Sequence, residues 1–405
     1  MTERKWIVAA FANFGVAALL GLVLRCTPFV EIPLLNFRHV THAHSHAAMM
    51  GWLYMAIFGL VLHTFLRENE RNGRLFRWLF WILQFAVVGM VCSFPFQGYG
   101  AVSITFSAIH LFASYTFLVA IWKKLVNAER QSKLLLKTAI VLMMFSTLGV
   151  YSIGPATVFA GRFSDLYNLC IQFFLHFQFQ GWFFFALLAI FFQRMHVSGS
   201  DILSPKTFSW FYSLLLFACF GMIALPIAQF LGWEFLLPLN TVGATAQLAA
   251  VLILFTALNK FKHAIGNSSF VIKIAVWAVV VSLLVKAIGQ AALSWPSIAI
   301  APVLIRPMVV GFIHLLLLSA ASFFIIGSLN GIKVFPIRTN YLKRGLIGLL
   351  IGIVVTEVAL FVQAFSIWTE TSVFYHYHEV LLLGSVMLFA SVVVLFLTAV
   401  SKPNG

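Results

Sequence analysis

Long apolar runs, separated by short stretches rich in charged residues, Pro or Gly, fill the chain from residue 6 to residue 399. Each run has about the 20 residues that a helix needs to cross a hydrocarbon core of roughly 30 Å. The runs lack the alternation of apolar and polar positions that is typical of an outer-membrane barrel. The pattern predicts twelve transmembrane helices, at residues 6–26, 43–65, 77–95, 102–122, 135–155, 169–193, 207–230, 240–259, 271–292, 304–328, 344–367 and 372–399.

The composition supports this class. The 405 residues are 62% hydrophobic and only 9% charged, which is far less charge than a soluble domain carries. The segments between the apolar runs are too short to fold by themselves. The run that follows Lys5 is too long for a cleaved signal peptide and is interpreted as the first span. We therefore expect an all-α, polytopic membrane protein with a single transmembrane domain over residues 1–405.

The net charge of +15 carries information on topology. Of the 26 Lys and Arg residues, 21 fall in the termini and the even-numbered loops between predicted spans. Cytoplasmic loops carry the positive excess, so both termini are expected in the cytoplasm of a bacterium, with the protein in its inner membrane. The lipid bilayer, and not a nucleic acid, is the expected partner. The other five basic residues are Arg25, Arg38, Arg162, Lys286 and Arg306.

The four cysteines contain no CxxC pair and no CxxCH heme-attachment motif, so any heme is expected to be noncovalent or delivered by a partner. Cys26, Cys92 and Cys170 fall near the outer ends of predicted spans. A disulfide between two of them stays open at this point.

Nine of the twelve histidines fall outside or just within the outer ends of predicted spans. At 1.5 Å per residue, four of them (His110, His176, His314 and His378) lie roughly 7–10 Å below the outer surface. Each one alone is explained by a hydrogen bond to a neighbouring helix. Ionisable groups inside membranes tend to mark functional sites, however, and a layer of imidazoles favours metal or heme ligation. The nine are His39, His42, His44, His46, His110, His176, His314, His376 and His378.

The densest histidine motif spans residues 38–52. In a helix, His39, His42 and His46 share one face, while His44 points to nearly the opposite face. Two interpretations remain open here. His42 and His46, at positions i and i+4, chelate one ion, or His46 is an axial heme ligand. His39 is interpreted as a surface residue.

Two further spans carry candidate ligands. In the sixth span, His176 and Gln180 share a helical face and offer a buried polar pair. In the tenth, Pro307 suits the first turn of a helix, and His314 lies two turns deeper. Arg306, at the rim, either pairs with a heme propionate or extends toward lipid phosphate.

Lys286 in the ninth span and Glu357 in the eleventh are charged residues within apolar runs. Neither is expected to face lipid. Two roles are equally favoured for these residues: they form an ion pair with each other, or they are part of a proton path.

Twelve spans, cytoplasmic termini and histidines near the outer ends of spans two, six and ten resemble the catalytic subunit of heme-copper oxidases and nitric oxide reductases. The resemblance implies a heme b held by His46, or less favourably His44, together with His314. It also implies copper at His176. A second metal or heme near His176 would use His42, His110, His376 or His378. The run from His42 to Gly51 is also similar to the histidine motif of NnrS-like membrane proteins.

The chain departs from that pattern. The seventh span has no histidine, so the usual copper-ligating pair is missing, and the tenth span has one histidine where the family has two. Gln180 stands where a tyrosine is expected. The resemblance implies electron transfer or nitric oxide or dioxygen chemistry, with a cytochrome or another subunit as electron donor. The alternatives are a transporter of a metal ion or small solute with a histidine-lined outer opening, and a sensor or assembly factor without a cofactor.

Overall fold

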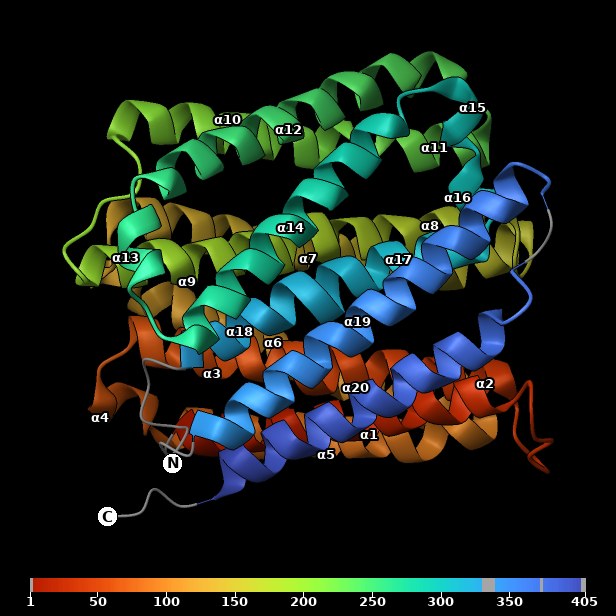
Figure 1. The fold of residues 1–405 in the computed structure, drawn as a ribbon, viewed down its shortest axis with the longest axis horizontal. Coiled ribbons are helices and arrows are strands. Elements are labelled where there is room, and N and C mark those ends of the chain that lie inside the picture. Colours follow the sequence, from red (N-terminus) through yellow and green to blue (C-terminus); the bar gives the residue numbers. More distant parts are fainter. Residues whose placement is uncertain (1–2, 330–338, 372–373, 402–405) are drawn as a thin grey trace. The chain divides into compact units, whose positions relative to one another are not determined.

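The computed structural model describes residues 3–329, 339–371 and 374–401. These described residues form helices joined by short turns, with no strand among them (Figure 1). Within them, twelve helices are long and apolar enough to cross a membrane, which confirms the predicted number of spans. The last predicted span began at residue 372. Residues 372–373 lie outside the described part, and the helix begins at Tyr377.

The helices belong to two compact units. Unit 1 comprises residues 1–124, 269–278 and 313–405, and unit 2 comprises residues 125–268 and 279–312. The helix α14 (Phe270–Ala292) contributes to both units, and so does α17 (Arg306–Ile313). The other helices of unit 1 are α1 (Glu3–Cys26), α2 (Phe37–His46), the π-helix η1 (Ala47–Tyr54), α3 (Met55–Phe65), α4 (Glu68–Arg71), α5 (Arg74–Gln97), α6 (Ala101–Lys124), the π-helix η5 (His314–Ala321), α18 (Ser322–Leu329), α19 (Thr339–Trp368) and α20 (Tyr377–Val400).

Unit 2 holds the middle of the chain. Its longest helix is α7, which packs against α8 and α9, while α10 packs against α12. The helices of unit 2 are the 3₁₀-helix η2 (Leu125–Asn127), α7 (Arg130–Ala160), α8 (Asp165–His176), the π-helix η3 (Phe177–Phe183), α9 (Phe184–Val197), α10 (Pro205–Gly221), α11 (Ala224–Leu231), the 3₁₀-helix η4 (Glu234–Leu236), α12 (Leu237–Asn259), α13 (Lys262–Gly266), α15 (Pro296–Ala299) and α16 (Ala301–Leu304).

The two ends of the chain meet in unit 1. The helix α1 packs along α20, and α20 packs along α19 (Figure 1). The Arg4 guanidinium donates hydrogen bonds to the carbonyls of Val400, at 3.1 Å, and Ser401, at 2.9 Å. The start of α1 and the end of α20 therefore lie at the same end of this unit.

The second span begins earlier than its apolar run predicted. The sequence pattern gave a start at residue 43, whereas α2 begins at Phe37. The Asn36 side chain accepts hydrogen bonds from the backbone N–H groups of Arg38 and His39, both at 3.1 Å. This N-cap satisfies backbone donors that would otherwise have no partner, so the helix extends into a polar segment. The whole histidine motif is consequently helical.

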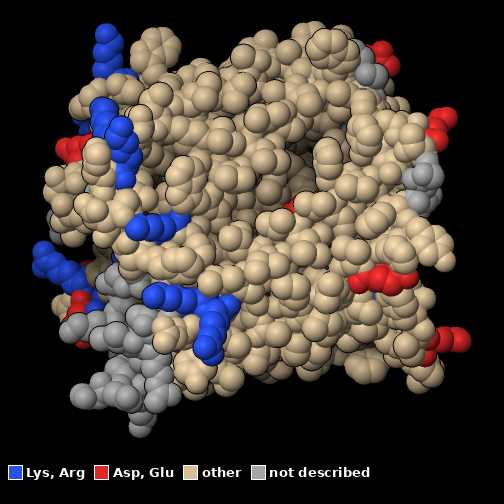
Figure 2. Space-filling view, viewed as in Figure 1, with Lys and Arg blue, Asp and Glu red and all other residues tan. Residues whose placement is uncertain are grey.

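Large apolar side chains cover much of the outside of the helices. Trp78, Trp210 and Phe361 are each more than three-fifths exposed. In the face drawn in Figure 2, the surface between the charged helix ends carries few Lys, Arg, Asp or Glu side chains. A lipid environment accounts for this exposure because it does not penalise apolar surface. All four cysteines are free, so no disulfide joins Cys26, Cys92 or Cys170.

Lys124, at the end of α6, forms an ion pair with Glu70 of α4 at 3.0 Å. The hydrogen bond from the ammonium lowers the pKa of the Glu70 carboxyl below its usual value. A carboxyl whose folded-state pKa is lowered stabilises the protein above its ordinary pKa, and this stabilisation is lost as the pH falls through the folded-state value. We expect Glu70→Gln to lower the free energy of unfolding at neutral pH by at most about 1 kcal/mol, since the pair is partly exposed. In denaturation measurements, the difference should disappear under acid conditions and shrink in high salt.

Candidate functional site

Three π-helical segments interrupt the spans, and each one begins at a candidate histidine. His46 directly precedes η1, His176 directly precedes η3, and His314 is the first residue of η5. These segments lie in the second, sixth and tenth spans. π-Helical turns are rare and occur frequently at functional sites. The three histidines named by the resemblance thus share a backbone feature that the sequence analysis did not predict.

Two of these segments share a sequence signature as well. His46 is followed after four residues by Gly51-Trp52, and His176 is followed after four residues by Gly181-Trp182. Both glycines and both tryptophans are buried. This repeat is visible in the sequence, although the sequence analysis missed it.

Side chains in each unit satisfy polar groups around the π-helices. In unit 1, the Asn13 amide donates to the Gly51 carbonyl at 3.0 Å. In unit 2, the Gln247 amide donates to the Gln180 side-chain oxygen at 3.1 Å. Gln180 is thus paired with a residue of α12.

The glycine of each signature lies against a neighbouring helix. A Cβ at Gly51 would come within 2.8 Å of the Asn13 Cβ, and one at Gly181 would come within 2.8 Å of the Leu142 Cβ. We expect Gly51→Ala and Gly181→Ala each to lower the free energy of unfolding by about 1–3 kcal/mol, the usual cost of overpacking.

Matched controls exist in the same units. Nothing lies within 4 Å of a Cβ built at Gly15 in α1 or at Gly154 in α7. Alanine there should leave stability unchanged or raise it by up to about 1 kcal/mol, because alanine favours a helix more than glycine does. Thermal unfolding in detergent micelles provides the comparison. Equal effects at all four positions would show that the close contacts are not responsible.

The main polar cluster of unit 1, which we call the His44–His314 cluster, consists of Arg25, His44, His314 and Glu357. His44 and Arg25 both act electrostatically on His314. The His314 Nδ1 lies 3.8 Å from the Glu357 Oε1, and both of these buried atoms have no hydrogen-bond partner. Arg25 also hydrogen-bonds Tyr377. These interactions connect residues of spans one, two, ten, eleven and twelve.

His44 is held by the first span. Its Nδ1 lies 2.8 Å from the Ala17 carbonyl, and a Cβ at Gly21 would come within 3.0 Å of its ring. A carbonyl only accepts, so this nitrogen carries the proton and the other nitrogen, Nε2, keeps its lone pair. An N–H donated to a backbone carbonyl is the usual arrangement of an imidazole that ligates a metal through its other nitrogen.

His42 and His46 lie on the other face of α2. Both rings contact Phe94 and Tyr99, and the His46 ring centroid lies 4.3 Å from that of Phe94. The His46 Nδ1 bonds the His42 carbonyl at 2.8 Å. His110 of α6 is 2% exposed and acts electrostatically with His46. Of the two heme-ligand candidates in span two, His44 is the one that acts electrostatically on His314.

The corresponding cluster of unit 2 surrounds His176. Its Nε2 lies 2.7 Å from the Cys219 carbonyl, in the helix that begins the seventh span. Lys286 is 3% exposed, and its ammonium donates to the Gln290 side chain at 2.8 Å and lies 5.5 Å from the centre of the Phe184 ring. Lys286 and Glu357 belong to different units, and each has its own polar neighbours.

Several predicted site residues lie away from these clusters. His376 and His378 are exposed at the start of α20, where His376 lies 3.9 Å from Glu379. Arg306 is exposed at the start of α17, in unit 2. Among the residues described, no three His, Cys, Asp or Glu side chains are grouped so as to hold a metal ion.

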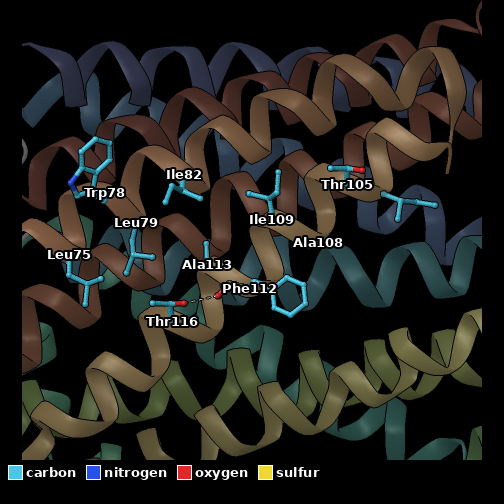
Figure 3. Close-up of a pocket in the computed structure, with 11 residues that line it drawn as sticks. Leu75, Trp78, Leu79, Ile82, Thr105, Ala108, Ile109, Phe112, Ala113 and Thr116 are labelled. Carbon is cyan, nitrogen blue, oxygen red and sulfur yellow. Dashed lines mark hydrogen bonds between the residues drawn. The ribbon is translucent and has the colours of Figure 1, made fainter.

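A groove of about 660 Å³ runs between α5 and α6. Figure 3 shows it lined by apolar side chains that include Trp78 and Phe112, with a hydrogen bond from Thr116 to the Phe112 carbonyl. No histidine lines it, and its walls suit a lipid acyl chain.

No protein-family model matches the chain, and no curated protein matches it significantly. The fold and the clusters define a polytopic α-helical membrane protein with two histidine-containing polar centres. Sequence reasoning found the histidines but missed Arg25 and Cys219 as their neighbours. Arg25 was noted only as a basic residue away from the positive loops.

Proposed function

We propose that the protein is a heme-binding integral membrane protein that transfers electrons, and that His44 and His314 would hold one heme b. The observation that carries this proposal is the polar cluster of unit 1, in which His44 of span two acts electrostatically on His314 of span ten. Both rings are half-buried and close enough for electrostatic interaction. Low-spin hemes in electron-transfer proteins take this kind of ligand pair.

The residues of the His44–His314 cluster fit such a group. The His44 Nε2 retains its lone pair because the Ala17 carbonyl takes the Nδ1 proton. On His314, the buried Nδ1 faces the Glu357 carboxyl at 3.8 Å, and a carboxylate there would orient a ligating imidazole. Arg25 supplies a positive charge for a propionate. Arg306 was the propionate partner expected from the sequence, but it belongs to unit 2 and has no part in the proposal.

A bound heme with two imidazole ligands would supply one-electron transfer. The chain itself fixes the ligand tautomer through Ala17, balances charge through Arg25 and Glu357, and excludes water with the apolar walls of the spans. The proposal keeps the resemblance to heme-copper oxidases, the bacterial inner membrane, cytoplasmic termini and a cytochrome or other donor subunit. Copper at His176 and nitric oxide or dioxygen chemistry are not needed for it.

The test is an absorption spectrum and a heme assay of protein purified in detergent from heme-replete cells. We expect about one heme b per chain and the spectrum of a low-spin, six-coordinate iron. A colourless, iron-free protein would contradict the proposal. If that protein also moved a metal ion or solute into vesicles, the transporter alternative would be favoured; without such uptake, the sensor or assembly factor would be.

A further inference from the structure

We propose that the groove between α5 and α6 binds an acyl chain of an acidic phospholipid, whose headgroup lies against the basic end of these two helices. The groove has a volume of about 660 Å³ and lies within unit 1. Side chains of both helices line it (Figure 3). No residue of the His44–His314 cluster is among them, so the proposal is independent of the proposed heme.

The walls of the groove favour a hydrocarbon occupant. Apart from Thr105 and Thr116, every side chain that lines it is apolar. The Thr105 hydroxyl donates to the Ala101 carbonyl at 2.8 Å, and the Thr116 hydroxyl donates to the Phe112 carbonyl at 3.0 Å. Both hydroxyl protons are thus used within α6. A polar solute in the groove would lose hydrogen bonds to water without replacing them, whereas a hydrocarbon chain has none to lose.

The length of the groove suits one leaflet of a bilayer. Its lining residues run along α6 from Ile104 to Thr116, which is about 18 Å at 1.5 Å per residue. The hydrocarbon layer of one leaflet is about 15 Å deep, half of the bilayer core. Trp78 is 67% exposed and Phe112 is 58% exposed, so the groove is open to the surrounding lipid. An acyl chain of one leaflet therefore matches it in both chemistry and length.

The charge at one end of the groove indicates the headgroup. The helices α5 and α6 are packed neighbours joined by residues 98–100, so the start of α5 and the end of α6 lie at the same end. Figure 3 shows Leu75 and Thr116 toward this end and Thr105 toward the other. Residues 67–77 and 123–124 contain six Arg or Lys residues and only two Glu residues. An excess of positive charge beside a membrane-facing groove attracts acidic lipids.

Two exposed basic residues lie on the groove side of their helices. Arg74 lies one turn before Trp78 in α5, and Lys123 lies two turns beyond Thr116 in α6. Residues four or seven positions apart share a helical face. Long basic side chains keep their stems on apolar surface and their charged groups in the polar region, where a lipid phosphate lies. Lys124, by contrast, is already paired with Glu70.

The experiment measures lipid binding to the full-length protein, delipidated in detergent, by native mass spectrometry. The probes are phosphatidylglycerol and phosphatidylcholine with the same acyl chains. We expect phosphatidylglycerol to bind more than about tenfold more tightly, and Arg74→Gln and Lys123→Gln each to weaken its binding about fivefold without affecting phosphatidylcholine. Ala108→Phe, which places a ring in the groove, should weaken the binding of both lipids. Arg74→Lys should keep the preference, which shows that charge, and not misfolding, explains the effect of Arg74→Gln.

Two matched controls lie on α5. Arg77 is as exposed as Arg74 but lies one turn before Trp81, which does not line the groove, so Arg77→Gln should bind both lipids nearly as the unaltered protein does. Val88→Phe enlarges a half-exposed side chain outside the groove and should also leave binding unchanged.

The proposal is overturned if the unaltered protein binds the two lipids equally, if Arg77→Gln weakens phosphatidylglycerol binding as much as Arg74→Gln, or if Val88→Phe acts like Ala108→Phe. A second copy of this chain is the competing occupant of the groove. A dimer of the lipid-free protein that Ala108→Phe dissociates would therefore overturn the proposal as well.

Discussion

His44→Ala and His314→Ala are each expected to remove heme from the purified protein, lowering the heme content at a fixed heme supply by more than about tenfold. Either substitution deletes one of the two proposed iron ligands. A single remaining imidazole would hold the heme less tightly and would leave the iron able to bind small ligands. Any residual heme should therefore show a high-spin spectrum and react with carbon monoxide, which the unaltered protein should not do.

His46→Ala is the matched control for that experiment. His46 lies two residues from His44 on the same helix and is similarly half-buried, but its ring contacts Phe94 and Tyr99. The heme content of this variant should remain near that of the unaltered protein. Loss of heme in His46→Ala, with heme retained in His44→Ala, would restore His46 as the ligand that the resemblance first favoured. A fluorescence or size-exclusion profile confirms that each variant is folded.

The role of Glu357 beside His314 can be tested separately. Glu357 faces the His314 Nδ1 at 3.8 Å. Replacing its carboxyl with Glu357→Gln should keep the heme but raise its reduction potential, because a carboxylate close to a ligating imidazole makes that ligand more basic. A redox titration of the two proteins measures the change, and an unchanged potential would show that Glu357 does not orient His314.

The number of spans could be predicted from the sequence because each span is an apolar run of about the length that crosses a bilayer. The same logic failed at the ends of spans. The helix α2 begins at Phe37 rather than at residue 43, because the Asn36 cap, and not hydrophobicity, sets that boundary. A cap depends on one side chain and its local backbone, so it changes the mean hydropathy of a window of about 20 residues very little.

The candidate site was only partly accessible from sequence. His314 and His176 were identified by their distance along the helix from the outer end of each predicted span. That distance does not determine which neighbouring side chain a ring faces. That information depends on the π-helices, which change the angular spacing after His46, His176 and His314. It also depends on contacts between distant segments, such as His44 with Ala17. The proposal of His44 in place of His46 therefore draws on the structure.

Trp52→Ala is expected to be the most destabilising single substitution in unit 1, lowering the free energy of unfolding by about 3 kcal/mol. Trp52 is 2% exposed and stacks on Phe14 at 4.6 Å. Its indole N–H donates to the Ser322 hydroxyl at 2.9 Å, and Ser322 in turn donates to the Leu317 carbonyl at 3.0 Å. Trp52 of η1 is thus bonded to Ser322 of α18, which is bonded in turn to Leu317 of η5. The value lies at the low end of the range for soluble proteins because lipid is as apolar as the core, so lost packing, rather than transfer from water, supplies the cost.

Two further variants separate the contributions to this effect. Trp52→Phe keeps most of the ring packing and removes the hydrogen bond, so we expect it to cost about 1 kcal/mol, and Ser322→Ala should cost a similar amount. If the bond is the shared cause, the double variant should cost less than the sum of the two single variants. Trp78→Ala is the control because it removes the same side-chain atoms at an exposed position. Trp78 is 67% exposed and lines the groove of Figure 3. Its effect should stay within about 0.5 kcal/mol, and an equal loss at both tryptophans would show that burial in the core does not explain the stability of η1.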